Sequence, residues 1–143
     1  MTISFDGKVC VVTGAGNGLG RCHALALAER GAKVVVNDLG GARDGTGASS
    51  EAADTVVDEI IKNGGEAFSH GANVTNYEEV VDMIKQTMER WGRIDVLINN
   101  AGILRDKSFS KMELSDFKLV LDVHLMGSVN CTKAVWDIMK EQN

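Results

Sequence analysis

Short apolar runs alternate along the chain with stretches in which apolar residues recur at helical spacing. The apolar runs are rich in Val, which is typical of strands buried on both faces, and they predict strands at residues 8–13, 34–36, 66–71 and 94–98. The helical spacing predicts helices at residues 17–30, 52–63, 76–91 and 115–140. Because strand and helix alternate, we expect an α/β fold, a Rossmann-like doubly wound parallel sheet.

Three details of these helices can be read from single residues. Asn76, with Glu79 three positions later, is a helix-start signature. The first helix has apolar residues at helical spacing, namely Leu19, Cys22, Leu25 and Ala28. The last helix contains Gly127, and we expect it to break or bend around this residue.

Composition and charge bound the kind of protein. A chain of 143 residues with 44% hydrophobic residues is long enough for one domain with a core. The net charge of −5 and the scattered basic residues argue against nucleic acid as a partner. No apolar run approaches the roughly 20 residues of a membrane span, and no secretory signal precedes the first strand. We therefore expect a cytoplasmic protein without a membrane partner or metal site, with Cys10, Cys22 and Cys131 as reduced core thiols.

Glycines stand at positions 14, 16, 18 and 20, between the first strand and the first helix. Such glycines let the backbone turn tightly and approach a ligand, while the helix N-terminus offers unpaired N–H groups to phosphate. The spacing differs from the G-x-G-x-x-G dinucleotide fingerprint, because Leu19 stands where its third glycine would be. The glycine turn after the first strand therefore predicts phosphate binding but does not identify the ligand.

Asp38 ends the second strand, where a carboxylate can accept hydrogen bonds from both hydroxyls of a dinucleotide's adenosine ribose. It would also repel a 2′-phosphate, so NAD is expected rather than NADP. The alternative is that Asp38 only caps a loop. The glycine-rich connection at residues 39–50 is long for such a fold, and it is either an insertion or a flap over bound ligand.

Asn99-Asn100-Ala101-Gly102 directly follows the fourth strand. Together with Thr13-Gly14-x-x-x-Gly18-x-Gly20 it resembles the short-chain dehydrogenase/reductase family, over essentially the whole chain. The segments at residues 37–41, 52–60, 99–106 and 122–128 resemble one branch of it. That branch holds the (3R)-hydroxyacyl-CoA dehydrogenase units of multifunctional enzymes type 2 and their stand-alone bacterial relatives.

The resemblance implies an NAD-dependent oxidoreductase that moves a hydride between nicotinamide and a secondary alcohol or ketone, here a 3-hydroxyacyl-CoA type of small-molecule substrate. It implies that Asn17, Gly18 and Leu19 lie at the phosphates and Asp38 at the adenosine ribose. Asn73 and Val74 would edge the adenine. The full implied cofactor set is Thr13, Gly14, Asn17, Gly18, Leu19, Gly20, Asp38, Asn73, Val74, Asn100, Ala101 and Gly102.

Two further residues have open roles. His124 stands where the family has a supporting Asn, and it either carries a water chain or is a buried histidine bonded to backbone at a helix kink. Asp95 either braces the adenine pocket from the fourth strand or serves only the fold. His23 and His70 have no partner at catalytic or ligand spacing, so we expect no site at either.

The family's catalytic Tyr-x-x-x-Lys is not found in this sequence. The only tyrosine is Tyr77, and the residue four positions later is Val81. We therefore expect residues 1–143 to be the N-terminal, NAD-binding portion of a short-chain dehydrogenase/reductase domain, truncated after the fourth strand and the long helix. The apolar stripe of residues 128–140 would then lack cover, and the family buries this helix in a homo-oligomer.

Two other function classes remain open at this point. One is a non-catalytic NAD-binding module, which the missing Tyr-x-x-x-Lys favours for this polypeptide. The other is an S-adenosylmethionine methyltransferase, which also carries a glycine turn and an acidic residue at the end of the second strand. Such an enzyme usually has an acidic residue two positions before the first glycine, where this chain has Val12. The location would be peroxisomal if the chain belongs to a eukaryotic multifunctional enzyme.

Overall fold

The computed structural model describes residues 3–142. Its strands are β1 Val9–Thr13, β2 Lys33–Asn37, β3 Glu66–His70 and β4 Val96–Ile98. Its α-helices are α1 Gly18–Glu29, α2 Glu51–Lys62, α3 Tyr77–Trp91, α4 Leu114–Leu121 and α5 Gly127–Glu141. A 3-10 turn, η1 Phe109–Lys111, precedes α4, and a π-helical turn, η2 Asp122–Met126, joins α4 to α5.

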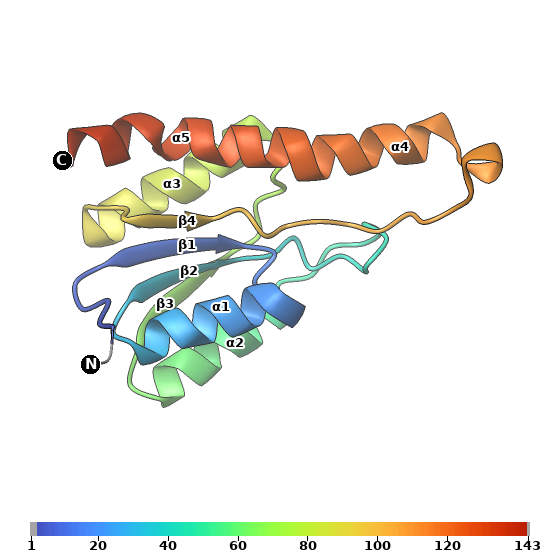
Figure 1. The fold of residues 1–143 in the computed structure, drawn as a ribbon. Coiled ribbons are helices and arrows are strands. Elements are labelled where there is room, and N and C mark those ends of the chain that lie inside the picture. The colour runs from blue at the N-terminus through green and yellow to red at the C-terminus, as the bar shows by residue number, and fades with distance from the viewer. Residues whose placement is uncertain (1–2, 143) are drawn as a thin grey trace.

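The strands form one parallel sheet in the order β3-β2-β1-β4. Figure 1 shows α1 and α2 on one face of the sheet and α3 and α5 on the other. The chain winds outward from β1 to β3, then crosses to the other side of β1 to form β4. The predicted doubly wound parallel sheet is confirmed, with β3 at an edge as expected.

The core has two halves because successive side chains of a strand point to opposite faces. Cys10, Val12 and Val34 are among the buried residues that face α1 and α2, while Val11 and Val35 belong to the half under α3 and α5. Central strands buried on both faces explain why the sequence shows continuous apolar runs there rather than alternation.

The start of α3 is confirmed in detail. The Asn76 side chain accepts hydrogen bonds from the N–H groups of Glu78 (3.1 Å) and Glu79 (3.4 Å). In return, the Glu79 carboxylate accepts from the Asn76 amide at 2.9 Å. Gly92, with a φ of 71°, ends the helix in the left-handed conformation.

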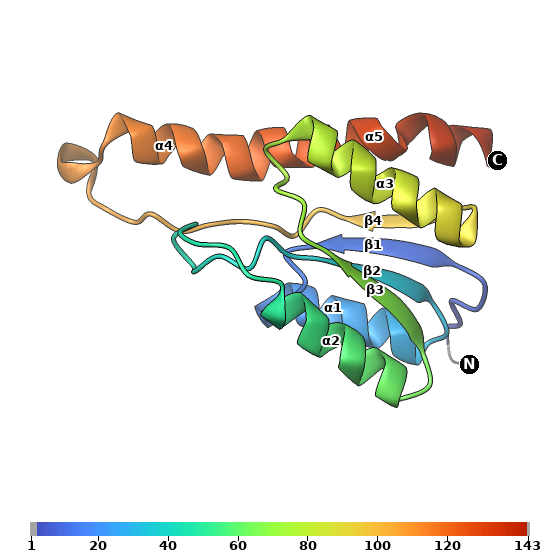
Figure 2. The same ribbon diagram turned by 180° about the vertical axis from the view of Figure 1, so that it is seen from behind.

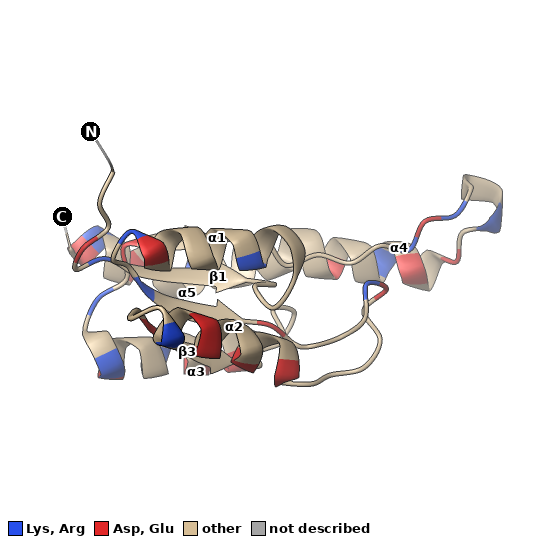
Figure 3. Cartoon of the chain, turned by 90° about the horizontal axis from the view of Figure 1, so that it is seen from below, with Lys and Arg blue, Asp and Glu red and all other residues tan. Residues whose placement is uncertain are grey.

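The long C-terminal helix is irregular around Gly127, as predicted. The irregularity is the π-helical turn η2, and α5 begins at Gly127 directly after it. A Cβ at Gly127 would lie 2.6 Å from Val74 Cγ2, so this glycine serves close packing of α5. One side of α5 lacks cover as predicted, with Val129 48% and Trp136 60% exposed. In the view from below (Figure 3), α4 projects beyond the sheet and acidic and basic residues are interspersed.

The apolar stripe predicted for α1 is confirmed only in its second half, where Leu25 and Ala28 pack partly buried against the core. Leu19 is 73% exposed and Cys22 is exposed, whereas Gly20 and Ala24 are buried. Small residues face the sheet here because α1 packs closely against it. Cys10 and Cys131 are buried as expected, and burial raises the pKa of each thiol to about 11.

Candidate functional site

The strand order reverses between β1 and β4, so the crevice at their carboxyl ends is where ligands bind in sheets of this topology. A pocket of about 600 Å³ opens there. Nine of the predicted cofactor residues line it, from four separate segments of the chain. They are Gly14, Asn17, Gly18, Asp38, Asn73, Val74, Asn100, Ala101 and Gly102.

The glycine turn is braced from behind by the segment after β4. The Thr13 hydroxyl accepts hydrogen bonds from the N–H groups of Asn100 and Ala101, both at 3.0 Å. The Asn100 amide donates to the carbonyls of Thr13 and Gly14, also at 3.0 Å. A Cβ at Gly14 would lie 2.8 Å from Ala101 Cα, so only glycine allows this approach. Thr13 and the Asn100 side chain therefore shape the turn from within the protein.

The start of α1 faces the pocket with unpaired donors. Its N-cap, Asn17, makes no side-chain capping bond, and the first intrahelical contact is that of Arg21 N–H with the Asn17 carbonyl. The N–H groups of Gly18, Leu19 and Gly20 precede that bond and are free of helical partners. With no acidic residue in the first turn, this end of α1 can receive an anion. Leu19 and Gly20 are not among the residues that line the pocket, and their predicted contact with phosphate stays a prediction.

Asp38 lies between the glycine turn and the loop that follows β2. One carboxylate oxygen accepts from Gly16 N–H at 2.8 Å and the other from Gly40 N–H at 2.7 Å. Each oxygen has a second acceptor position left, so the group can still bind a pair of hydroxyls. Asp38 thus caps the loop and also lines the pocket, and its binding of a ribose stays a prediction.

The turn after β3 forms the opposite wall. Asn73 and Val74 line the pocket as expected, but the Asn73 side chain accepts from the N–H and hydroxyl of Thr75, at 3.0 and 2.8 Å. The Val74 carbonyl accepts from the Asn130 amide of α5 at 2.9 Å. Asn130 is a contributor that the sequence did not reveal.

His124 lies on the π-helical turn and is exposed, so the prediction of a buried histidine is wrong. Its Nε2 atom is 3.1 Å from the Ile103 nitrogen and 2.9 Å from the Ile103 carbonyl oxygen. The backbone bond at a helix irregularity is as expected. Since Nε2 is engaged, only Nδ1 is left for a water chain, and that role stays a prediction.

The glycine-rich loop at residues 39–50 is anchored beside the segment after β4, and Figures 1 and 2 show the two running side by side. Leu104 N–H donates to the Arg43 carbonyl at 2.9 Å, and Arg105 donates to the Asp44 carbonyl at 2.8 Å and to the Asp116 carboxylate of α4. Part of this loop lines the pocket, which favours the flap over a free insertion.

Asp95 does not brace an adenine pocket. It precedes β4, at the amino ends of the strands, and accepts hydrogen bonds from Val9 N–H (2.9 Å) and from Arg93. The Arg93 guanidinium and this backbone N–H, with Lys8 nearby, lower the pKa of Asp95 to about 2. Its role belongs to the fold, because the pocket lined by the predicted cofactor residues is at the other end of the sheet.

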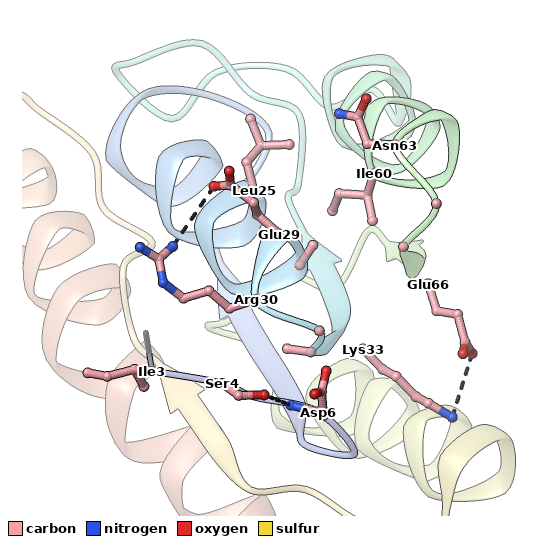
Figure 4. A pocket seen from close by; sticks show the side chains of 15 residues that line it. Ile3, Ser4, Asp6, Leu25, Glu29, Arg30, Lys33, Ile60, Asn63 and Glu66 are labelled. Carbon is pink, nitrogen blue, oxygen red and sulfur yellow. Dashed lines mark hydrogen bonds and ion pairs between the residues drawn. The ribbon is translucent and has the colours of Figure 1, made fainter. Parts of the chain in front are cut away.

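A second pocket, of about 770 Å³, lies at the amino ends of the strands between α1 and α2. Figure 4 shows two ion pairs among its lining side chains, Lys33 with Glu66 and Arg30 with Glu29. None of the predicted site residues lines it. Among the described residues, no cluster of three metal-ligating side chains occurs, and no helix is long and apolar enough to cross a membrane.

The family profile described as "short chain dehydrogenase" matches residues 8–143. The peroxisomal multifunctional enzyme type 2 of Drosophila melanogaster is 56% identical over an alignment of 144 positions, which covers 99% of this chain and 23% of that protein. A 3-oxoacyl-[acyl-carrier-protein] reductase of Synechocystis is 50% identical over 94% of this chain and 51% of its own length.

Solved structures agree with these relatives. A 7α-hydroxysteroid dehydrogenase complexed with NADH superposes with a TM-score of 0.86 at 32% identity, covering 97% of this chain and 51% of its own. The chain therefore spans at most about half the length of these proteins. The profile match, the identities and the glycine turn braced by Asn100 together show that the chain belongs to the short-chain dehydrogenase family.

Proposed function

We propose that this chain is the NAD-binding part of an oxidoreductase that transfers a hydride between nicotinamide and a secondary alcohol or ketone. The crevice has the size of a small-molecule site, at about 600 Å³, and it joins unpaired helix N–H groups to a carboxylate. These two features suit the pyrophosphate and the adenosine ribose of one dinucleotide. The NADH in the related hydroxysteroid dehydrogenase supports a nicotinamide cofactor.

The choice of NAD over NADP rests on Asp38. Two backbone N–H groups fix its carboxylate, so it cannot swing away from a ligand without losing both bonds. A 2′-phosphate at that ribose would bring a second anion next to this fixed negative charge, and like charges at such a distance repel. The free hydroxyls of NAD would instead donate to it. This single carboxylate carries the proposal.

The substrate is proposed from the relatives. The similar proteins include peroxisomal multifunctional enzymes and a 3-oxoacyl-[acyl-carrier-protein] reductase, which favours a 3-hydroxyacyl thioester. The multifunctional enzymes among these relatives are named as peroxisomal, which favours a peroxisomal location over a cytoplasmic one. The exposed Val129 and Trp136 support self-association through residues 128–140, which sedimentation of wild type beside Trp136→Ser tests.

A second candidate function is an NAD-binding module without turnover. Tyr77 is the only tyrosine of the sequence, it starts α3 with 43% of its surface exposed, and Val81 follows four residues later. Because no lysine stands four residues after it, Tyr77 cannot form the Tyr-x-x-x-Lys pair that performs the family's proton transfer. Absorbance at 340 nm with NAD and a short 3-hydroxyacyl-CoA separates the two candidates when it is measured on this chain and on a longer protein that contains it. NADH formed by the longer protein alone supports the first candidate, and NADH formed by neither supports the module.

The proposal is tested by isothermal titration of the chain with NAD and with NADP. Wild type is expected to bind NAD at least tenfold more tightly than NADP, and Asp38→Ala is expected to lower that ratio severalfold. Asp38→Ala also removes the hydrogen bonds to the N–H groups of Gly16 and Gly40 and so loosens the glycine turn. The ratio is informative because this loosening would weaken the binding of NAD and of NADP alike. Asp58→Ala, on the exposed side of α2, is the matched control for loss of one negative charge. An unchanged ratio in Asp38→Ala would contradict the proposal.

A further inference from the structure

The turn between β3 and α3 carries the wall of the pocket on which the adenine is expected, and Figure 2 shows it leaving the end of β3. Ala72 and Val74 are buried there. The sheet ends at His70, so strand pairing does not hold this turn beyond that residue. Something else must fix its position.

Asn37, the last residue of β2, supplies one part of the answer. It is a polar residue only 1% exposed, and its amide donates to the carbonyls of His70 and Ala72, both at 3.0 Å. Its own carbonyl accepts from Ala15 N–H at 2.8 Å, inside the glycine turn. One buried side chain and its backbone thus tie the adenine wall to the phosphate turn.

His70 supplies the other part. Its Nδ1 atom accepts a hydrogen bond from Ala72 N–H at 3.1 Å, so Nε2 carries the ring proton. That nitrogen lies 3.1 Å from the Asp82 carboxylate of α3, which also accepts from Gln86 at 2.8 Å. The contact with His70 holds the pKa of Asp82 below its usual range. Asp82 therefore stays charged and fixes the tautomer that Ala72 requires.

We propose that Asn37 and His70 are positioning residues that clamp Ala72 and so set the adenine wall of the cofactor site. Both backbone groups of Ala72 are taken by side chains, its N–H by His70 and its carbonyl by Asn37. The Asn73 side chain is tied to Thr75 and does not correct a shift of the wall. The inference rests on the proposed function, because it assigns the adenine end of the dinucleotide to this wall.

The test compares two substitutions of His70. In His70→Asn, the side-chain oxygen reaches the place of Nδ1 and keeps an acceptor for Ala72 N–H, whereas His70→Leu removes it. Losing one such hydrogen bond is expected to weaken binding about fivefold. Titration with NAD and with AMP should give His70→Leu the same loss for both ligands, since the perturbed wall touches only the adenosine end. His70→Asn should bind both within about twofold of wild type.

Two further variants keep the test decisive. His23→Leu makes the same change at an exposed histidine of α1 and should leave both affinities unchanged. Asp82→Ala, at a half-exposed position, spares the ring but frees its tautomer, and it should weaken NAD and AMP alike even if His70→Leu does not fold.

The outcomes separate the two proposals. Failure of wild type to bind NAD refutes the proposed function itself. If wild type binds NAD normally and the affinities of His70→Leu, Asp82→Ala and His23→Leu for NAD are equal, the clamp alone is refuted. A loss in His70→Asn as large as in His70→Leu also refutes it, because the acceptor at Nδ1 would then be irrelevant.

Discussion

Replacing Gly14 by Ala probes the closest approach in the site. Gly14 has a φ of 62°, a conformation that costs an L-residue about 1 kcal/mol. The new Cβ would also lie 2.8 Å from Ala101 Cα, whereas carbon atoms rest about 3.5–4.0 Å apart. The turn must therefore shift by roughly 1 Å away from Ala101.

That shift acts on the bonds that brace the turn. The Asn100 amide donates at 3.0 Å to each of the Thr13 and Gly14 carbonyls, and each bond contributes about 1 kcal/mol. With the left-handed strain, we expect Gly14→Ala to lower the free energy of unfolding by about 3 kcal/mol. The displaced N–H groups should weaken NAD binding at least tenfold.

Urea unfolding and NAD titration measure the two effects. Gly92→Ala is the matched control, because Gly92 has a φ of 71° and a Cβ added there would meet nothing within 4 Å. It should lose only about 1 kcal/mol and keep its NAD affinity. If Gly14→Ala were as stable as Gly92→Ala and bound NAD normally, the close approach would have no role and the reasoning would be refuted.

Three further predictions concern the supports of the site and the sheet. Thr13→Val should lower the free energy of unfolding by about 2 kcal/mol in urea, since two backbone donors lose their acceptor, while Thr13→Ser should not. Arg105→Lys should speed hydrogen exchange at Leu104 N–H, because a lysine does not bridge Asp44 and Asp116; unchanged protection would count against an anchored loop. Asp95, with its pKa lowered from 3.8 to about 2, should contribute about 2 kcal/mol of stability above pH 4, lost as the pH falls through 2. Urea curves of wild type and Asp95→Asn should therefore differ at pH 7 and converge near pH 2, and a constant gap would contradict this.

Sequence patterns predict the framework of this protein well. Strand and helix order, the edge position of β3 and the cap at Asn76 all follow from local rules of periodicity and side-chain chemistry. Gly14, Asp38 and Asn100 can be placed at one site because each follows a parallel strand, and such strand ends meet at one edge of the sheet.

The failures lie where contacts are distant in the sequence. An adenine role for Asp95 is wrong because this residue lies at the other end of the sheet. Its position in the sequence does not reveal its partners Val9 and Arg93. The sequence shows no partner for His70 at catalytic or ligand spacing. In the structure Asp82, on the next helix along the chain, lies beside it. The apolar spacing of α1 predicts that Cys22 is buried. In the structure Cys22 is exposed, and the small residues Gly20 and Ala24 are buried against the sheet instead.

The proposed function requires that NAD binds in the crevice at the carboxyl ends of β1 and β4. Amide chemical shifts of the ¹⁵N-labelled chain, recorded during titration with NAD, test it most directly. We predict the largest changes at Gly18 and Leu19, at Asp38 and at Ala101, with residues near Lys33 unaffected. Changes confined to the pocket at the amino ends of the strands, or none at saturating NAD, would contradict the claim.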